Sequence, residues 1–392
     1  MRSIFDEMYE PIKLKGKIKI GTFFSGIGTP EMALANITKN YETVFYCEVN
    51  PYPIKSYKEI HGHDIENLGD ITKIESIPYV DILHHSPPCQ DLSKAGKRKG
   101  AGEGTRSGLM YETIRILKNT PLNDRPKVVI MEQVIDLLSE VFKHHLHALL
   151  KELESLGYYT YTSLLNAKDY EIPQNRNRLF MISTLGEYAY DFPRYKKLKF
   201  KLRDFLEESV AEKYYPKKLD GVFGNAINKE LKDRINRSKM KLNPNIAYTL
   251  NLNPQRCVGD SNYVVEGIDD EITVEDYLLI PEATKKGYAV AHEGDGVYVN
   301  RPHQKRGVVQ KRMIQTLKTS GNDVGVVVKK EKQLRIRLLT PLEFWRLMGI
   351  SDENFYKAKS VNSDSQLYKQ AGNAIVVDVF EAILRQMIEV EE

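Results

Sequence analysis

The first half of the chain alternates short apolar segments with stretches of helical periodicity, and this alternation limits the possible folds more than any other feature. Apolar segments suited to buried strands lie at residues 18–24, 43–47, 81–84, 128–131 and 178–183. Between them, apolar side chains recur at helical spacing in residues 31–37, 54–60, 109–117 and 141–156. Strands that alternate with helices fold into a parallel sheet covered by helices. We therefore predict an α/β core with a Rossmann-like sheet.

A second region interrupts this pattern. From about residue 186 the composition shifts toward Lys, Asn, Pro and Tyr, and the alternation does not return until about residue 332. Thr340, Pro341 and Glu343 then form a capping-box pattern, and residues 375–388 have the spacing of an apolar-faced helix. A chain of 392 residues is long enough for two lobes. We predict a core in two parts, residues 1–185 and 334–392, with a smaller lobe, residues 186–333, inserted between them.

The composition argues against several classes of protein. No apolar run is long enough to cross a bilayer, and residues 1–19 do not have the pattern of a secretory signal, so we expect a cytoplasmic protein.

Cys47, Cys89 and Cys257 lie far apart, which disfavours a disulfide framework or a structural metal site and leaves room for one reactive thiol. The formal net charge is only +4, so contacts with nucleic acid must come from local clusters. One cluster follows Cys89 at residues 94–106, although such a run can also be a solvated face.

A glycine-containing turn follows the first predicted strand. Residues 24–28 read Phe-Ser-Gly-Ile-Gly, so the backbone can pass close to a ligand at the end of that strand. Glu48 ends the second strand and can accept hydrogen bonds from ribose hydroxyls, while Asp70 can accept one from an adenine amino group. The turn lacks the complete Gly-x-Gly-x-x-Gly pattern, which favours a nucleoside thioether such as S-adenosylmethionine over a diphosphate. The alternatives are a turn shaped only by its glycines, a solvated Glu48 and an ordinary turn residue at Asp70.

Residues 85–93 read His-Ser-Pro-Pro-Cys-Gln-Asp-Leu-Ser and form the most informative motif. Two prolines before Cys89 remove backbone donors and place the thiol on a loop after a strand. In an open α/β sheet this loop lies at the carboxyl edge, on the same side as the glycine turn. A lone cysteine is commonly a small core residue, but the prolines, Gln90 and the Gly- and Lys-rich segment that follows favour a catalytic Cys89.

Charged residues flank two further predicted strands. Glu132 follows the apolar segment 128–131, and a carboxylate at this end of a strand faces the cleft in such a sheet. Arg176 and Arg178 lie at the start of the segment 178–183, and their spacing of two directs both guanidinium groups to one face, where they can bind a carboxylate or a phosphate. A surface acid and structural ion pairs are the alternative interpretations.

Six segments, in this order, make the chain resemble the DNA (cytosine-5-)-methyltransferases. They are Phe-Ser-Gly-Ile-Gly at 24–28, Pro-Cys-Gln at 88–90, Glu-Gln-Val at 132–134, Gln-Asn-Arg-Asn-Arg at 174–178, Arg-Leu-Leu-Thr-Pro-Leu-Glu at 337–343 and Gln-Ala-Gly-Asn-Ala at 370–374. The resemblance spans the chain except for the inserted lobe. It implies an α/β S-adenosylmethionine-dependent methyltransferase sheet with an inserted target-recognition domain, and methyl transfer to C5 of a cytosine in double-stranded DNA.

The resemblance also implies roles for individual residues. Cys89 attacks C6 of a flipped-out cytosine, Glu132 contacts N3 and the amino group, and Arg178, with Arg176 beside it, helps to hold the base or Glu132. The residues expected to bind S-adenosylmethionine are Phe24, Ser25, Gly26, Gly28, Glu48, Val49, Asp70, Ile71, Pro88, Leu109, Asn373 and Ala374. Those expected to contact DNA, from a mobile catalytic loop, are Gln90, Ser93, Lys94, Lys97, Arg98 and Lys99. No metal is implied.

The chain departs from the family pattern at two positions. Gln133 replaces the usual Asn of the Glu-Asn-Val motif, and its extra methylene affects how the active-site loop is anchored. Leu92 stands where the family often has Phe.

The sequence leaves other functions open. A tRNA cytosine methyltransferase has the same chemistry, but those relatives usually carry a Cys-Phe-Thr tripeptide, absent here, and a shorter insert. A catalytically silent DNA-binding relative would keep the scaffold, and a nicotinamide oxidoreductase is disfavoured by the incomplete glycine pattern. The expected partner is double-stranded DNA. We expect the protein to be a monomer and to be associated with the nucleoid through this DNA. A restriction endonuclease acting separately, a phage origin and an enzyme that works alone are all compatible with the sequence.

Overall fold

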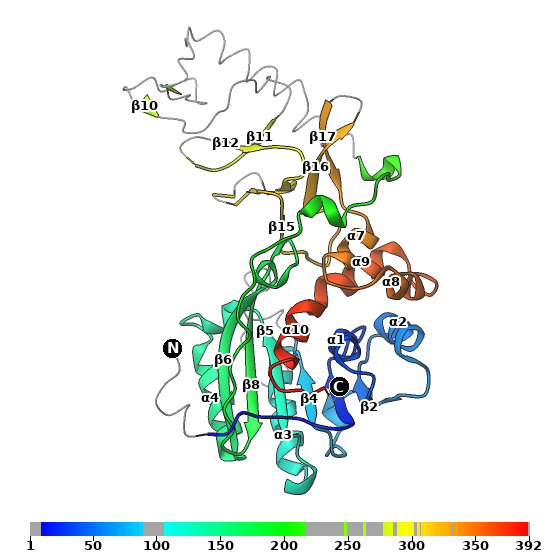
Figure 1. Cartoon of the computed structure of the whole chain (residues 1–392), viewed down its shortest axis with the longest axis vertical. Helices are drawn as coiled ribbons and strands as arrows, with labels where there is room; N and C mark the ends of the chain where they lie inside the picture. Colours follow the sequence, from blue (N-terminus) through cyan, green and yellow to red (C-terminus); the bar gives the residue numbers. More distant parts are fainter. Residues whose placement is uncertain are drawn as a thin grey trace. The chain divides into compact units, whose positions relative to one another are not determined.

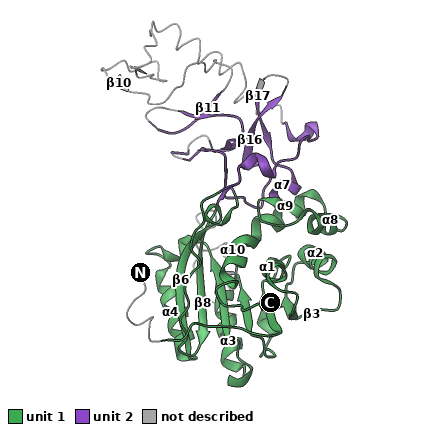
Figure 2. Ribbon diagram, in the orientation of Figure 1, with its two compact units in different colours: residues 1–172, 176–198, 345–392 green, residues 173–175, 199–344 purple. Residues whose placement is uncertain are grey.

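The computed structural model describes residues 9–88, 106–215, 247–248, 262–263, 277–284, 288–301, 304–305, 307–330 and 333–390. The chain divides into two compact units, coloured separately in Figure 2. Unit 1 comprises residues 1–172, 176–198 and 345–392, and unit 2 comprises residues 173–175 and 199–344. The structure thus places the main boundaries after residues 198 and 344, whereas the composition places them after 185 and 333.

Unit 1 contains a seven-stranded sheet with the order β3-β2-β1-β4-β5-β8-β6 (Figure 1). Its strands are β1 (Ile18–Phe23), β2 (Tyr41–Cys47), β3 (Glu66–Asn67), β4 (Ile82–His85), β5 (Val128–Gln133), β6 (Tyr158–Asn166) and β8 (Asn177–Leu185). The first five strands run parallel, and β1 pairs with both β2 and β4. Strand order therefore changes direction between β1 and β4, the position at which open α/β sheets bind ligands beyond the carboxyl ends of their strands.

The predicted parallel sheet has an antiparallel edge. β8 runs antiparallel to both β5 and β6. The sequence gives no apolar signal for β6, because its residues are mainly Tyr, Thr and Ser and its burial is only partial. Hydroxyl groups replace aliphatic contacts there: Thr160 Oγ1 and Ser183 Oγ lie 2.8 Å apart in a hydrogen bond between β6 and β8.

The four helical segments predicted in the first half of the chain are confirmed within a few residues. They are α1 (Thr29–Ile37), α2 (Pro51–His61), α3 (Met110–Asn119) and α4 (Lys143–Ser155). The returning segment adds α7 (Pro341–Arg346), α8 (Asp352–Lys359), α9 (Asp364–Asn373) and α10 (Val377–Leu384), of which α10 is shorter than the predicted helix 375–388. No helix in the described ranges combines the length and the apolar character that crossing a bilayer demands.

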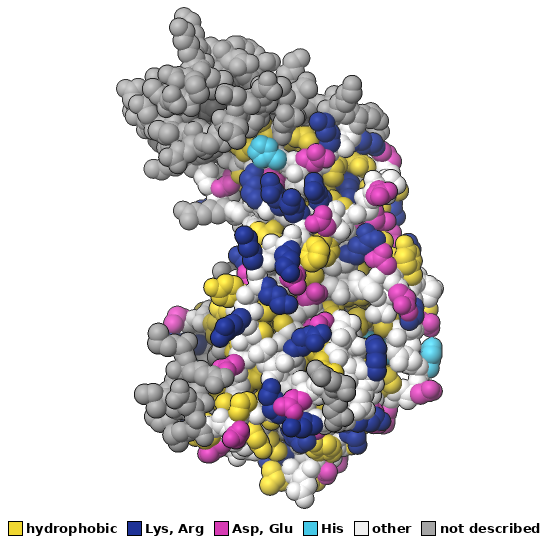
Figure 3. Space-filling model, in the orientation of Figure 1, with side chains coloured by type: hydrophobic (Ala, Val, Ile, Leu, Met, Phe, Trp, Pro, Cys, Tyr) yellow, Lys and Arg dark blue, Asp and Glu magenta, His cyan; other side chains and the backbone are white. Residues whose placement is uncertain are grey.

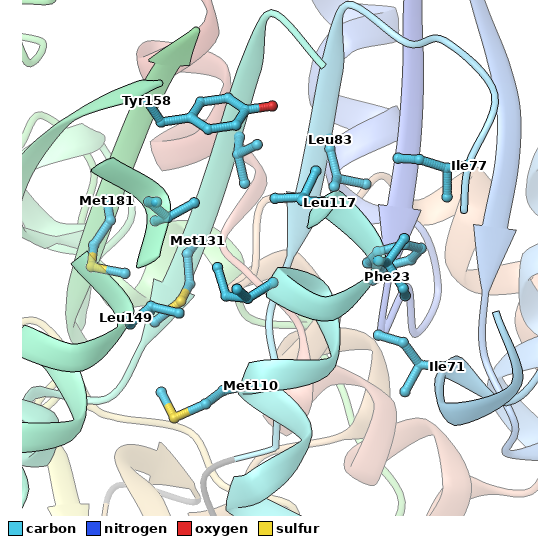
Figure 4. Packing of buried hydrophobic residues seen from close by; sticks show 14 of the residues in the cluster. Phe23, Ile71, Ile77, Leu83, Met110, Leu117, Met131, Leu149, Tyr158 and Met181 are labelled. Atoms are coloured by element: carbon cyan, nitrogen blue, oxygen red, sulfur yellow. The ribbon is translucent and has the colours of Figure 1, made fainter. Parts of the chain in front are cut away.

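A hydrophobic core of unit 1 lies between the sheet and helices α3 and α4 (Figure 4). Phe23, Leu83 and Met131 come from β1, β4 and β5, and they pack with Leu117 of α3 and Leu149 of α4. Removing such side chains from water is the main favourable contribution to folding. Because side chains alternate along a strand, the neighbour of Leu83 faces the opposite side of the sheet. There the ring of His84 packs edge-on against Phe380 of α10.

Unit 2 contains strands that the sequence does not predict, and all the pairs they form are antiparallel except one parallel pair of two-residue strands. A four-stranded sheet has the order β14-β13-β16-β17, and its strands are β13 (Gly296–Tyr298), β14 (Val309–Gln310), β16 (Val324–Lys330) and β17 (Gln333–Leu338). Smaller pairs join β9 (Ala247–Tyr248) to β10 (Asn262–Tyr263), β11 (Leu278–Pro281) to β12 (Tyr288–Ala291) and β7 (Gln174–Asn175) to β15 (Ile314–Gln315). Apart from β16 and β17, these strands have only two to four residues and are too short to show a clear apolar period.

The end of unit 2 is stabilised by the capping box predicted at residues 340–343. The Glu343 backbone N–H donates to Thr340 Oγ1 at 3.2 Å, and the Thr340 N–H donates to the Glu343 carboxylate at 2.8 Å. Arg337 from β17 donates two further hydrogen bonds to that carboxylate, at 2.7 and 2.8 Å. Both partners are buried, with side-chain exposures of 3% for Arg337 and 0% for Glu343. Glu343 therefore accepts hydrogen bonds from the strand and from the start of α7.

We predict that Arg337→Met destabilises the protein by about 3–5 kcal/mol, because it leaves the Glu343 carboxylate buried and unpaired. The double variant Arg337→Met/Glu343→Leu should recover most of this loss, since it removes both charges. Urea unfolding, followed by the fluorescence of Trp345, measures the loss of stability. Trp345 is the single tryptophan and lies in the same helix as Glu343. The exposed pair of Lys357 and Glu353 is the control, and Lys357→Ala should leave the urea midpoint nearly unchanged. Equal midpoints for Arg337→Met and Lys357→Ala would contradict the prediction.

Candidate active site

A cavity of about 600 Å³ opens at the carboxyl ends of β1, β2, β4 and β5, within unit 1. Its walls also include the start of β8 and the end of α9. This is the edge at which the strand order changes direction. The described residues contain no group of three His, Cys, Asp or Glu side chains arranged to hold a metal ion.

The turn after β1 depends on backbone conformations that favour glycine. Phe24, Gly26 and Gly28 have φ angles of 55°, 56° and 76°, which lie in the left-handed region. A Cβ atom on Gly28 would lie 2.3 Å from His61 Nε2, whereas a Cβ atom on Gly26 would meet no atom within 4 Å. Gly28 therefore lets the start of α1 pack against α2, while Gly26 keeps the backbone open toward the cavity. A non-glycine residue such as Phe24 in this region stores strain, which is typical of ligand sites.

Glu48 ties the end of β2 to this turn. Its Oε2 accepts a hydrogen bond from the Gly26 N–H at 3.1 Å. Its Oε1 accepts hydrogen bonds from the N–H groups of Val49 and Asn50 at 2.9 and 2.8 Å. The carboxylate is thus oriented by three backbone donors beside the cavity, and an incoming pair of hydroxyl groups can still bind to its remaining lone pairs.

Asp70 and Cys47 form the adjoining wall. Hydrogen bonds from the Thr72 N–H and hydroxyl hold the pKa of Asp70 below its ordinary value, so its carboxylate is charged at neutral pH. The Cys47 thiol donates to the Gly69 carbonyl at 3.0 Å, and burial raises its pKa to about 12. Cys47 is therefore a buried structural thiol rather than a nucleophile.

The prolines after β4 lie in the wall of the cavity, and a side chain from β5 fixes them. Gln133 Nε2 donates to the Pro87 carbonyl at 2.6 Å, and Gln133 Oε1 accepts from the Val134 N–H at 3.3 Å. Pro87 and Pro88 cannot donate backbone hydrogen bonds, so this side-chain bond anchors the turn. The replacement of Asn by Gln therefore preserves an anchor here. Cys89, the next residue in the chain, lies outside the described residues.

Glu132 is held by two donors at the end of β5. Arg178 Nε lies 2.8 Å from Glu132 Oε1 in an ion pair, and Ser86 Oγ donates to Glu132 Oε2 at 2.9 Å. Glu132 is 8% exposed and lines the cavity together with both partners. Of the two roles that the resemblance implies for Arg178, the structure thus shows contact with Glu132.

Arg176 has different partners from Arg178. Its Nη2 donates to the carbonyls of Gly372 and Ala374 at 3.1 and 2.9 Å. The guanidinium group is buried and joins the start of β8 to the end of α9. Arg176 therefore shapes the site by holding the returning segment, of which Asn373 and Ala374 line the cavity.

The structure brings most of the predicted site residues together. The predicted cofactor residues that line the cavity are Phe24, Ser25, Gly26, Glu48, Val49, Asp70, Ile71, Pro88, Leu109, Asn373 and Ala374. Gly28 does not line the cavity, but it shapes the turn that does. The predicted residues outside the described ranges are Cys89, Gln90, Ser93, Lys94, Lys97, Arg98 and Lys99. The segment 94–106, predicted to be a mobile loop, also falls there except for its last residue, and its mobility stays a prediction.

The cavity-lining residues that sequence reasoning did not assign to the site include Ser86, His84 and Gln370. Ser86 could have been found as the residue between the strand and the two prolines. His84 is buried, which lowers its pKa to about 3, so the ring is neutral at physiological pH. Gln370 Nε2 has no hydrogen-bond partner in the part of the chain that the structure describes, although its Oε1 accepts from Ser56. His84 carries no sequence signal, whereas Gln370 begins the Gln-Ala-Gly-Asn-Ala segment at 370–374.

Residues 18–389 match the profile of the C-5 cytosine-specific DNA methylases. The chain belongs to this family. It is 32% identical to the orphan methyltransferase M.SPRI of Bacillus phage SPR, covering 95% of this chain and 98% of the relative. It is also 32% identical to the type II methyltransferase M2.ScrFI of Lactococcus lactis subsp. cremoris, covering 83% of this chain and 71% of the relative.

Solved structures of methyltransferases have the same fold. The Entamoeba histolytica methyltransferase EhMeth has a TM-score of 0.58 at 18% identity, covering 95% of this chain and 98% of that one. The S. pombe Dnmt2 methyltransferase has a TM-score of 0.53 at 17% identity, covering 94% and 97%. The predicted S-adenosylmethionine-dependent α/β fold is thereby confirmed.

S-adenosylmethionine is the methyl donor of this methylase family, and the cavity fits it. Glu48 and Asp70 offer acceptors for ribose and adenine groups, and Phe24, Ile71 and Leu109 offer apolar surface. The unpartnered amide nitrogen of Gln370 offers a donor that a bound ligand can satisfy. When bound, the cofactor supplies an electrophilic methyl group.

We predict that Gly28→Ala and Gly26→Ala differ sharply in effect. Both substitutions force an L-residue into a left-handed conformation, at a cost of about 1–2 kcal/mol. Only Gly28→Ala adds a steric clash with His61, so it should also displace α1 or α2 and abolish measurable S-adenosylmethionine binding. Calorimetric titration and urea unfolding measure the two effects. If Gly28→Ala bound the cofactor as well as Gly26→Ala, the proposed role of Gly28 would be wrong.

We predict that Cys47 resists alkylation in the folded protein. With a pKa of about 12, only ~10⁻⁴ of its thiol is ionised at pH 8, and the side chain is 3% exposed. Iodoacetamide treatment followed by peptide mass spectrometry should find Cys47 unmodified until urea unfolds the chain. Raising the pH toward 10 should change little, since burial persists. Rapid modification of native protein at pH 8 would contradict this.

Proposed function

We propose that this methylase transfers a methyl group from S-adenosylmethionine to C5 of a cytosine within a short specific sequence of double-stranded DNA. The observation that carries the proposal is the site itself. One cavity combines a nucleoside-type pocket, the Pro-Pro turn that leads directly into Cys89, and the Glu132 carboxylate held by Arg178. Family membership supplies the reaction class.

The chemistry requires a nucleophile because cytosine C5 alone is too weakly reactive toward a methyl donor. In the proposed reaction the thiolate of Cys89 forms a bond to C6 while the ring electrons move toward N3. The ring becomes an enamine whose C5 takes the methyl group. Loss of the C5 proton to a base then allows the C6–sulfur bond to break, which regenerates the thiolate and the aromatic ring.

Glu132 acts where negative charge develops. A carboxyl group near N3 can donate a proton or hydrogen bond there, and such general acid catalysis typically contributes ~10²–10⁴-fold to rate. Arg178 fixes the carboxylate by an ion pair at 2.8 Å. Gln133, the residue after Glu132 in the same strand, donates a hydrogen bond to the Pro87 carbonyl. One strand therefore carries Glu132 and also holds the turn that leads to Cys89.

The target base must leave the DNA stack, because C5 and C6 are shielded within the duplex. Rotating a base out costs roughly a few kcal/mol, which contacts to phosphates can offset. We propose that residues 90–99 supply some of these contacts and that unit 2 reads the target sequence. Unit 2 carries Lys and Arg side chains on the face displayed in Figure 3, which supports contact with DNA.

The relatives suggest the biological setting. They include phage orphan methyltransferases and type II methyltransferases. We propose that this methylase likewise modifies DNA either on its own, as in a phage, or beside a separate restriction endonuclease. Sequencing of methylated cytosines in DNA from cells that express the chain identifies the target sequence.

We predict that duplex DNA containing 5-fluorocytosine at the target becomes covalently trapped by the chain in the presence of S-adenosylmethionine. Fluorine at C5 cannot leave as a proton does, so the bond to sulfur persists. Cys89→Ser should lose both trapping and labelled methyl transfer, while Cys47→Ser should still be trapped, because the buried Cys47 thiol does not form the bond to the base. The same transfer assay with tRNA tests the rival substrate. Full methyl transfer by Cys89→Ser, or preferential labelling of tRNA, would overturn the proposal.

A further inference from the structure

Ser86 occupies a position that neither the family match nor the proposed reaction assigns. β4 and β5 are paired in parallel, and their last partners in register are His85 and Met131. The next residue on each strand is Ser86 on one side and Glu132 on the other. The hydroxyl of Ser86 donates to Glu132 Oε2 at 2.9 Å, and both side chains line the cavity.

The two oxygens of the Glu132 carboxyl have chemically different partners. Oε1 faces the guanidinium of Arg178, whose Nε is 2.8 Å away. A guanidinium can donate hydrogen bonds but cannot accept them, so Oε1 cannot carry a proton while this pair is intact. Oε2 faces a hydroxyl group, which can both donate and accept. A proton on Glu132 therefore belongs on Oε2.

We infer that Ser86 is a positioning residue that orients Glu132 in both of its protonation states. This inference rests on the proposed function, in which Glu132 serves the cytosine ring. Without a base in the cavity, the Ser86 hydroxyl donates to Glu132 Oε2. When Oε2 carries the proton for transfer, its Oε2–H donates to Ser86 Oγ instead. When the base is in place, the Oε2–H bond breaks as the N3–H bond forms, and the thiolate bond to C6 forms at the same time. The Ser86 hydroxyl then rotates to donate to the carboxylate.

Arg178 alone would not achieve this orientation. A single ion pair at Oε1 leaves the carboxyl group free to rotate about its bond to the side chain, which would move Oε2 relative to the base. The contact from Ser86 removes this freedom on the side where proton transfer occurs. Misplacement of a reacting group by about 1 Å can cost on the order of 100-fold in rate.

The test compares Ser86→Ala, which removes the hydroxyl, with Ser86→Thr, which keeps one. We expect Ser86→Ala to lower the single-turnover rate of methyl transfer by about tenfold, with an upper limit near 100-fold. KM for DNA and the Kd for S-adenosylmethionine should not change, which also shows that the variant is folded. Ser86→Thr should restore most of the rate.

A control variant removes the hydroxyl of Ser183, which is buried within the same sheet as β4 and β5. Ser183→Ala breaks the hydrogen bond to Thr160 but touches no residue that lines the cavity. Its single-turnover rate should equal that of the unmodified chain. In a Glu132→Ala background, the loss caused by Ser86→Ala should disappear, because the group that Ser86 positions is absent.

The carboxyl carbon of Glu132, labelled with ¹³C, reports the same contact without turnover. Its NMR signal should shift in Ser86→Ala and stay in place in Ser183→Ala. An unchanged rate and an unchanged signal in Ser86→Ala would overturn the role of Ser86 and leave Cys89-dependent transfer standing. If the unmodified chain transferred no methyl group to DNA, the proposed function would fail, and the signal alone would decide whether Ser86 orients Glu132.

Discussion

The parallel pairing of β4 with β5 is the constraint on which the rest of the site depends. Backbone hydrogen bonds bring these two strands into register up to His85 and Met131. Beyond that point Ser86 and Pro87 contact Glu132 and Gln133 through side chains. The turn that precedes Cys89, the proposed nucleophile, and Glu132, the proposed acid, are thus set by a single strand pair, so their spacing cannot vary independently.

Much of this arrangement can be predicted from the sequence, for a definite physical reason. Buried parallel strands need continuous apolar runs, so β1, β4 and β5 stand out, and functional residues must follow their carboxyl ends. That reasoning leads from the order of the residues alone to Phe24, Cys89 and Glu132. The capping box at Thr340 and Glu343 is equally local and equally visible.

The rest depends on contacts that no local pattern encodes. β6 is built from Tyr, Thr and Ser, whose hydroxyl pairing with β8 is visible only once the two strands are adjacent. The two arginines of the segment 174–178 look equivalent in sequence, yet Arg178 pairs with a carboxylate and Arg176 with backbone carbonyls. Ser86 can be picked out in the sequence by its place before the two prolines, but its contact with Glu132 depends on the register of a neighbouring strand.

The contacts of Arg176 have a consequence for biosynthesis. Its partner carbonyls at Gly372 and Ala374 lie 196 and 198 residues further along the chain, after the whole of unit 2. A nascent polypeptide that has already exposed the Pro-Pro-Cys turn and Glu132 therefore still lacks one wall of its pocket. Completion of that wall must await synthesis of the last helices, so the cavity can form in full only near the end of translation.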